Sequence, residues 1–213
     1  MQARTERRRY RQGKRSELAA ETRRRLIAAA KVELTRRPLR RISLEAIAGA
    51  SGVSRPTVYA TFGSRGGLFD AVAEDTFMST GMADIAAAFE LSDPIEVMET
   101  SFPIGSRMYA KGRPIWHALL AMSAIDRSAS DAMLRTEQRR AAGMRDLASR
   151  LDAGGLLGKG VDRDAAFAQL WVVTSFAVFD LLTDAGLDPD DVTQWMFRTT
   201  RETLRLERLG RDQ

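Results

Sequence analysis

A short segment near the N-terminus concentrates side chains that can bind nucleic acid. Residues 54–65 read SRPTVYATFGSR. Arg55 carries a fork of N–H donors that matches the O6 and N7 atoms of guanine, and Thr57 can hydrogen-bond to several base edges. Pro56 and Ala60 are small enough to let a helix approach closely and pack on a thymine methyl group. The segment therefore predicts direct contacts with bases in the major groove.

A second set of side chains has the chemistry to bind phosphate. Hydroxyl groups, cations and helix N-termini all bind phosphate oxygens. The candidates of this kind are Ser43, Tyr59, Thr61 and Arg65. Three of them have a simpler alternative that the sequence leaves open. Ser43 could act as a helix cap alone. Tyr59 could be a half-buried core aromatic, and Arg65 could be a solvated charge.

Local signals place these residues on two short helices joined by a tight turn. Ser43 can cap the first helix and Gly52 can end it. In the second helix, Val58 and Phe62 lie one turn apart and form an inward face, which leaves the hydrogen-bonding side chains outside. The spacing predicts a helix-turn-helix over residues 43–62, in which one helix supports another in the major groove.

The rest of the chain also has helical patterns and no convincing strands, so an all-α fold is expected. An earlier helix begins between Ser16 and Glu21 and ends at Arg37-Pro38, because proline disfavours helix in the residue before it. Six longer helices follow, at about 66–90, 94–111, 114–126, 129–152, 162–185 and 189–208. Proline and glycine clusters set their boundaries.

Charge is distributed unevenly along the chain. Residues 1–65 hold 17 Lys and Arg against 5 acidic residues, whereas the remainder holds 16 against 23. A basic N-terminal third on an acidic remainder indicates one module that binds a polyanion. Residues 1–19 lack apolar periodicity and predict a flexible basic arm. The arm is expected to follow the DNA backbone or enter a minor groove, and the alternative is a solvated tail.

Several functional classes are excluded or disfavoured. The chain has no cysteine and one histidine, His117, so thiolate chemistry is excluded and no metal site is expected. Gly158-Lys159 lacks the following Ser or Thr of a phosphate loop, and no catalytic constellation stands out, so neither an enzyme nor a cofactor is expected. No apolar run is long enough to span a membrane. A cytoplasmic protein is the expectation.

Residues 22–73 resemble the DNA-binding domain of the TetR (tetracycline-repressor) family, most specifically in GVSRPTVYATFGSRGGLF. The resemblance implies a homodimer with a three-helix DNA-binding head and a larger helical body that binds an effector. It also implies base contacts by Arg55, Pro56, Thr57 and Ala60, a phosphate or base contact by Tyr59, and phosphate contacts by Ser43, Thr61 and Arg65. The sequence departs from the family at Arg37-Pro38, where glycine is usual, at Gly63, where proline is common, and at Arg65, where lysine is usual.

Glu45 stands where some members of that family place a side chain that contacts a base. Its carboxylate could accept a hydrogen bond from cytosine N4. It could instead only favour the N-terminus of the helix that Ser43 begins. The sequence favours the second interpretation and leaves the first open.

The expected domains are an arm at 1–19, a head at 20–80 and a body at 81–213. Methionine and aromatic side chains suit an adaptable apolar cavity, although such residues more often pack in a core. The candidate ligand-binding residues of the body are Met108, Trp116, His117, Met122, Trp171 and Phe176. Helices 162–185 and 189–208 are expected to form a four-helix dimer interface with their mates, and the alternative is that they are only a well-buried core.

These features together predict a dimeric regulator that binds double-stranded DNA at a palindromic operator. The favoured hypothesis is a repressor released by a small apolar or amphipathic effector. The main alternative is a ligand-independent or architectural DNA-binding protein. An activator is a third possibility.

Overall fold

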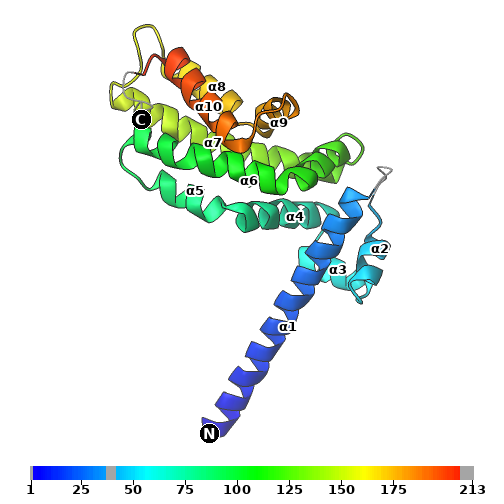
Figure 1. Ribbon diagram of the computed structural model, residues 1–213. Coiled ribbons are helices and arrows are strands. Elements are labelled where there is room, and N and C mark those ends of the chain that lie inside the picture. The colour runs from blue at the N-terminus through cyan, green and yellow to red at the C-terminus, as the bar shows by residue number, and fades with distance from the viewer. Residues whose placement is uncertain (1, 37–41, 207–213) are drawn as a thin grey trace. The chain divides into compact units, whose positions relative to one another are not determined.

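The computed structural model describes residues 2–36 and 42–206, which fold into α-helices joined by turns and loops. Within these ranges, side chains are described from residue 13 onward. In chain order the helices are α1 (Gln2–Thr35), α2 (Leu44–Ala50), α3 (Arg55–Phe62), α4 (Arg65–Thr80), α5 (Met82–Phe89), α6 (Pro94–Ser123), α7 (Arg127–Ala153), α8 (Arg163–Val173), α9 (Phe176–Asp184) and α10 (Pro189–Leu204) (Figure 1). The predicted all-α class is confirmed.

The chain forms two compact units. The N-terminal unit contains residues 1–75 and 117–133, and the second unit contains residues 76–116 and 134–213. Residues 117–133, the end of α6 and the start of α7, thus cluster with the N-terminal unit. The functional division at residue 80 stays a prediction.

The N-terminal unit is organised around the C-terminal half of α1. Its buried stripe is Leu26, Ile27, Ala30 and Leu34, each at most 5% exposed. The helical period places these residues on one face, and α2 and α3 pack against this part of α1 and against each other (Figure 1). Gly52, with φ of 66°, makes the turn between α2 and α3. The predicted helix-turn-helix over residues 43–62 is confirmed.

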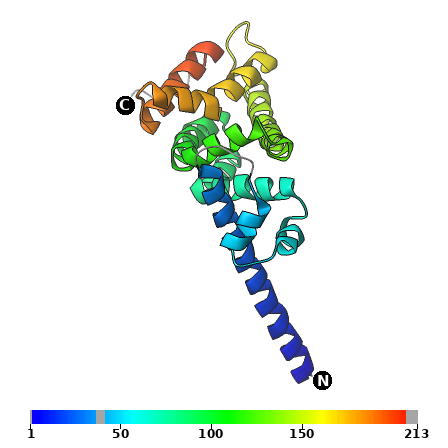
Figure 2. The same ribbon diagram turned by 90° about the vertical axis from the view of Figure 1, so that its right-hand side faces the viewer.

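The second unit is a helical bundle with a core drawn largely from α6 to α10. α8 and α10 lie side by side, and α9 packs against both (Figures 1 and 2). The buried side chains include Met98, Phe102 and Trp116 of α6, Leu147 and Leu151 of α7, Leu170 of α8, Phe179 of α9, and Val192 and Met196 of α10. Each of these helices contributes large apolar residues to the core. The apolar residues are therefore spread evenly along this part of the sequence.

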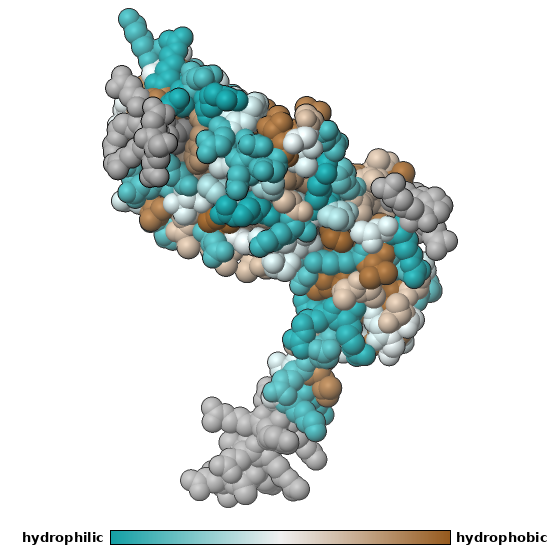
Figure 3. All heavy atoms as spheres, viewed as in Figure 1, coloured by the Kyte–Doolittle hydropathy of each residue, from teal (hydrophilic) through white to brown (hydrophobic). Residues whose placement is uncertain are grey.

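The segment expected to be a flexible arm belongs to a helix in the structure, because α1 begins at Gln2. Residues 13–21 of this helix are all exposed. The described part of α1 that faces the viewer in Figure 3 is largely hydrophilic. Residues 13–21 therefore owe their helical form to local propensity and not to burial. The departure at Arg37-Pro38 lies outside the described residues.

The break predicted at Gly112 to Pro114 is wrong, because α6 continues through it with Pro114 inside the helix. Gly112 does not end the helix but makes room for an indole. A Cβ atom at Gly112 would lie 2.7 Å from Trp116 Nε1. Arg113 also donates to Asp180 Oδ1 of α9 at 2.7 Å. Tertiary packing on both sides thus outweighs the local preference of proline.

Two helices predicted as continuous, 66–90 and 162–185, are each broken. Gly81, with φ of 133°, separates α4 from α5. α8 and α9 are bent by 48° at Thr174 and Ser175. The Ser175 side chain accepts the backbone N–H three residues later and so starts α9 as a new helix.

Across the described ranges, no single helix has both the length and the apolar composition to cross a membrane. The bent pair α8 and α9 meets that test by length and composition alone.

Candidate nucleic-acid interface

Ser43 fixes the start of α2. Its side-chain oxygen accepts the Ala46 N–H at 3.2 Å, so the capping role predicted for it is confirmed. The same hydroxyl donates to Glu45 Oε2 at 3.1 Å. Ser43 therefore holds both the helix end and the carboxylate of the first turn.

α3 presents the side chains that were predicted to contact DNA. Val58 is 2% exposed and fixes the inward face, with Phe62 half-buried beside it. The exposed residues of the opposite face are Arg55, Pro56, Tyr59 and Ala60. Because two of these are small and two can hydrogen-bond, the face suits close approach to base edges.

The two threonines of α3 are engaged locally. The Thr57 and Ser54 hydroxyl oxygens lie 2.9 Å apart, so one donates to the other. Thr61 donates to the Thr57 carbonyl oxygen at 2.8 Å. A phosphate only accepts hydrogen bonds, so Thr61 must rotate away from this carbonyl before it can bind one.

Arg55 is held between Glu45 and Tyr59. Its Nη1 atom lies 2.7 Å from Glu45 Oε1, which joins α3 to α2. Its Nη2 atom makes a long contact of 3.5 Å with the Tyr59 hydroxyl, and the guanidinium carbon lies 5.7 Å from the centre of the Tyr59 ring. The Tyr59 hydroxyl and the Glu45 charge raise the pKa of Arg55. The structure thus connects four predicted DNA-binding residues: Ser43, Glu45, Arg55 and Tyr59.

Arg65 has a different environment from Arg55. Its Nε atom donates to Asp126 Oδ2 at 2.8 Å, and its Nη1 atom donates to the Ile42 carbonyl oxygen at 2.8 Å. Its side chain is 25% exposed and that of Asp126 only 9%. A phosphate would have to compete with these partners, so the phosphate contact predicted for Arg65 stays a prediction. Through its hydrogen bonds, Arg65 links the segment before α2 to the start of α7, so it suits a positioning role.

Asp126 is a functional candidate that the sequence did not reveal. Its Oδ1 atom accepts the Ser128 N–H at 2.9 Å and starts α7. Burial works against ionisation, but the hydrogen bonds and charge of Arg65 outweigh it, together with backbone N–H groups, and hold the pKa of Asp126 below its ordinary value. An aspartate before a helix could have been recognised as a cap. Its pairing with a residue 61 positions away could not.

The six candidate ligand residues of the body do not form one cluster. Trp116, Phe176 and Met108 are buried in the second unit, and the Trp116 and Phe176 rings lie 6.4 Å apart. Met122 is buried in the N-terminal unit, whereas His117 and Trp171 are exposed. Their role in ligand binding stays a prediction.

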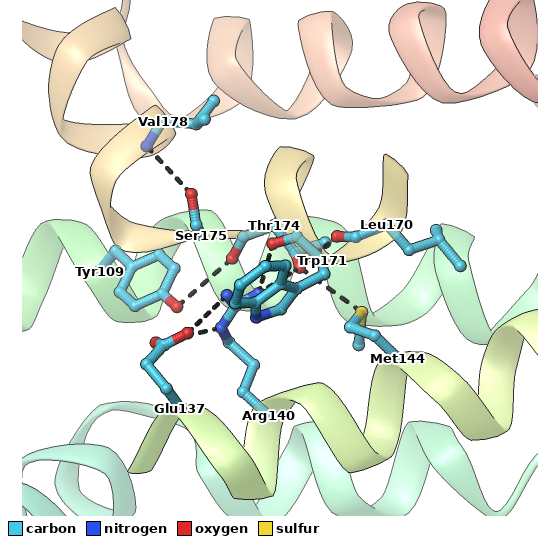
Figure 4. Close-up of polar contacts among 9 residues, drawn as sticks. All are labelled: Tyr109, Glu137, Arg140, Met144, Leu170, Trp171, Thr174, Ser175 and Val178. Carbon is cyan, nitrogen blue, oxygen red and sulfur yellow. Dashed lines mark hydrogen bonds and ion pairs between the residues drawn. The ribbon is translucent and has the colours of Figure 1, made fainter. Parts of the chain in front are cut away.

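A polar cluster satisfies the carbonyl groups at the break between α8 and α9 (Figure 4). Tyr109 donates to the Thr174 carbonyl oxygen at 3.3 Å, and Arg140 donates to the Trp171 carbonyl oxygen at 2.7 Å. Arg140 also pairs with Glu137 at 2.7 Å. Burial raises the pKa of Tyr109 to about 12. The cluster stabilises the bend and explains why α8 and α9 do not straighten.

An open groove lies between α1 and α2 in the N-terminal unit. It is lined by Arg25, Ala28, Ala29, Val32, Glu33, Arg36 and residues 49–52. None of the candidate ligand residues lines it.

Known proteins are similar to this chain in part of the N-terminal unit and in the fold. Residues 26–72 match the family described as bacterial regulatory proteins, tetR family. No curated protein matches the chain.

Solved structures resemble most of the chain. NalD of Pseudomonas aeruginosa, described as the secondary repressor of the MexAB-OprM multidrug efflux pump, has a TM-score of 0.71 and 22% identity over 90% of this chain and 99% of its own. A TetR-like transcriptional regulator from Rhodococcus sp. RHA1 has a TM-score of 0.61 and 19% identity, covering 86% and 96%. PfmR, a TetR-family transcriptional regulator from Thermus thermophilus, has a TM-score of 0.57 and 17% identity, covering 86% and 98%.

The fold and the exposed face of α3 define a DNA-binding regulator of the helix-turn-helix class. Residues 26–72 match the tetR family of bacterial regulatory proteins, and the chain has the fold of TetR-family transcriptional regulators. The resemblance noted in the sequence is therefore confirmed.

Proposed function

We propose that the protein is a homodimeric transcriptional repressor that binds a palindromic operator through α3 and leaves it when a small apolar or amphipathic molecule binds. The observation that carries the DNA-binding part is the exposed outer face of α3, with Arg55 and Tyr59 at its rim. NalD, a repressor of the same fold, supports repression over activation.

Exposed apolar side chains on α8 and α9 support the dimer. Val172 is 53% exposed and Leu181 is 70% exposed. Trp171 beside them is 39% exposed. Three large apolar side chains that are exposed on neighbouring helices fit an interface between two copies of the chain. Replacing Leu181 by Glu would then leave a monomer in light scattering, whereas an exposed Leu18→Glu change on α1 would leave the dimer intact.

Two copies of α3 on a twofold axis would read two half-sites about one helical turn apart. The decisive test is selection of bound sequences from a random duplex pool with the full-length protein. Enrichment of an inverted repeat supports the proposal. A protein that binds random duplex as tightly as any selected sequence would instead be an architectural DNA-binding protein, for which the seven cations between Arg4 and Arg15 would supply the affinity.

An effector releases the operator only if it binds the form that does not bind DNA more tightly. A tenfold shift needs about 1.4 kcal/mol of differential affinity. The selected operator makes this measurable, because a library of small apolar and amphipathic molecules can be screened for dissociation of the complex. A library that leaves the complex intact would count against effector control.

A further inference from the structure

A carboxylate lies on the face that the proposed function turns toward DNA. Glu45 is in the first turn of α2, and its side chain is 61% exposed. Phosphates repel a carboxylate at this position, so its presence beside α3 calls for a specific role.

The Glu45 carboxylate is ionised and held at both oxygens. Its Oε2 atom accepts from the Ser43 hydroxyl at 3.1 Å, and its Oε1 atom lies 2.7 Å from Arg55 Nη1. Its own backbone N–H, the Ser43 hydroxyl and Arg55 keep the pKa of Glu45 below its ordinary value. Because Ser43 is itself fixed as the cap of α2, the carboxylate has a fixed support.

Arg55 is thereby restrained on two sides. Glu45 holds one end of the guanidinium, and the Tyr59 ring and hydroxyl lie along the other. A guanidinium carries five N–H donors, so these contacts leave donors for a base. Restraining a long side chain before binding removes part of the entropy that binding would otherwise cost.

We infer that Glu45 is a positioning residue that orients Arg55 toward guanine and so sets the specificity of the operator complex at one base pair. This inference rests on the proposed function of operator recognition. Glu45 offsets the charge of Arg55, so the pair gains less from a phosphate than a free arginine does. The O6 and N7 atoms of guanine still accept the remaining donors. Glu45 thus favours the specific complex and opposes non-specific ones.

This role differs from the two alternatives that the sequence leaves open. Direct acceptance from cytosine N4 would make Glu45 read a base without Arg55. Stabilisation of the α2 N-terminus alone would affect folding and not base preference. The three roles predict different results when Glu45 and Arg55 are changed separately and together.

The test compares Glu45→Gln, Arg55→Ala and the double variant in the full-length protein. Each is used in selection from a random duplex pool, in binding to the selected operator and to random duplex, and in thermal unfolding. Glu74→Gln is the matched control, because it makes the same charge change outside this cluster. Glu74 is an exposed residue of α4, and its carboxylate lies 4.0 Å from the Arg23 guanidinium.

Glu45→Gln is expected to reduce the preference for one guanine by about tenfold, within the range that a bidentate arginine contact supplies. It should also bind random duplex more tightly, while its unfolding temperature matches that of the control. In the Arg55→Ala background, Glu45→Gln should change no base preference further.

Three results would overturn the inference. The guanine preference could survive in Glu45→Gln. A cytosine preference could be lost through Glu45→Gln even in the Arg55→Ala background, which would indicate direct reading. Unfolding alone could change, which would indicate helix stabilisation. If the unaltered protein enriches no sequence, the proposed function fails and the inference with it.

Discussion

Two arginines near α3 show how environment decides what one residue type does. Arg55 is 54% exposed and pairs with a carboxylate that is itself mostly exposed. Arg65 is 25% exposed and binds both Asp126 and the carbonyl group just before α2. Exposed pairs exchange readily with other partners, whereas a shielded pair with several hydrogen bonds does not. Arg55 therefore suits recognition and Arg65 suits positioning.

Arg55→Lys separates the charge of Arg55 from its shape. Lysine keeps the cation but loses the planar fork, so we expect discrimination at the contacted guanine to fall about tenfold. Affinity for random duplex should change by less than about twofold because the charge is kept. Titration of the selected operator and of a guanine-to-adenine operator measures the discrimination, and titration of random duplex measures the non-specific affinity. Arg24→Lys on α1 is the control, and equal losses on both duplexes would contradict base reading.

Asp126→Asn tests the positioning role of Arg65. The change keeps the size of the side chain and removes the charge, so we expect a loss of about 2 kcal/mol in the free energy of unfolding, typical of a hydrogen bond to a charged group. Operator affinity should also fall, because Arg65 holds the chain just before Ser43. Urea unfolding and operator titration measure the two effects.

The free energy of unfolding should also depend on pH through Asp126. Asp126 has a lowered pKa in the folded chain, so its contribution is present at neutral pH and is lost as the pH falls from the ordinary carboxyl value through the lowered one. The variant should lose that part of the acid dependence. The exposed Asp131→Asn change on α7 should retain it, and an identical acid profile for both variants would refute the role.

At the scale of elements, the helices fall into those that local signals define and those that tertiary contacts define. The cap at Ser43, the turn at Gly52 and the inward Val58 are local, so α2 and α3 could be predicted from sequence. The continuation of α6 past Pro114 depends on the burial of Trp116 and on the hydrogen bond from Arg113 to Asp180 of α9. Asp180 is far from Arg113 in sequence, so local signals could not predict this contact. For the same reason the outward residues of α3 were predictable, whereas the partners of Arg55 and Arg65 were not.

Gly112→Ala tests whether packing or propensity controls α6. Alanine normally stabilises a helix interior by up to about 1 kcal/mol over glycine. Here its Cβ atom would meet Trp116 Nε1 at 2.7 Å and Thr76 Cγ2 at 3.1 Å, so we expect a net loss of about 1 to 3 kcal/mol from overpacking. Gly105→Ala in the same helix meets nothing within 4 Å and should be neutral or stabilising. Chemical denaturation decides, and a stabilised Gly112→Ala would show that the indole moves at little cost.

In the molecule as a whole, the basic N-terminal region includes a segment that contributes little to the core. The first 65 residues carry the positive excess, and the rest of the chain is acidic. Yet residues 13–21 of α1 are exposed, so this part of the helix contributes little to the core of its unit. A segment that is strongly charged and unnecessary for packing is free to serve affinity for a polyanion.

Deleting residues 2–15 should therefore weaken DNA binding without unfolding the protein. For every phosphate that the deletion leaves unbound, the slope of log affinity against log salt falls in magnitude by about 0.9, so the truncated chain should show a flatter salt dependence on operator and random duplex alike. Its ratio of specific to non-specific affinity should rise, because Arg55 and Thr57 remain. A full-length variant with lysine in place of the arginines between Arg4 and Arg15 keeps the charge and should keep the slope. An unchanged slope after deletion would mean that this part of α1 does not contact the DNA backbone, and the affinity would then rest on α2, α3 and their surroundings.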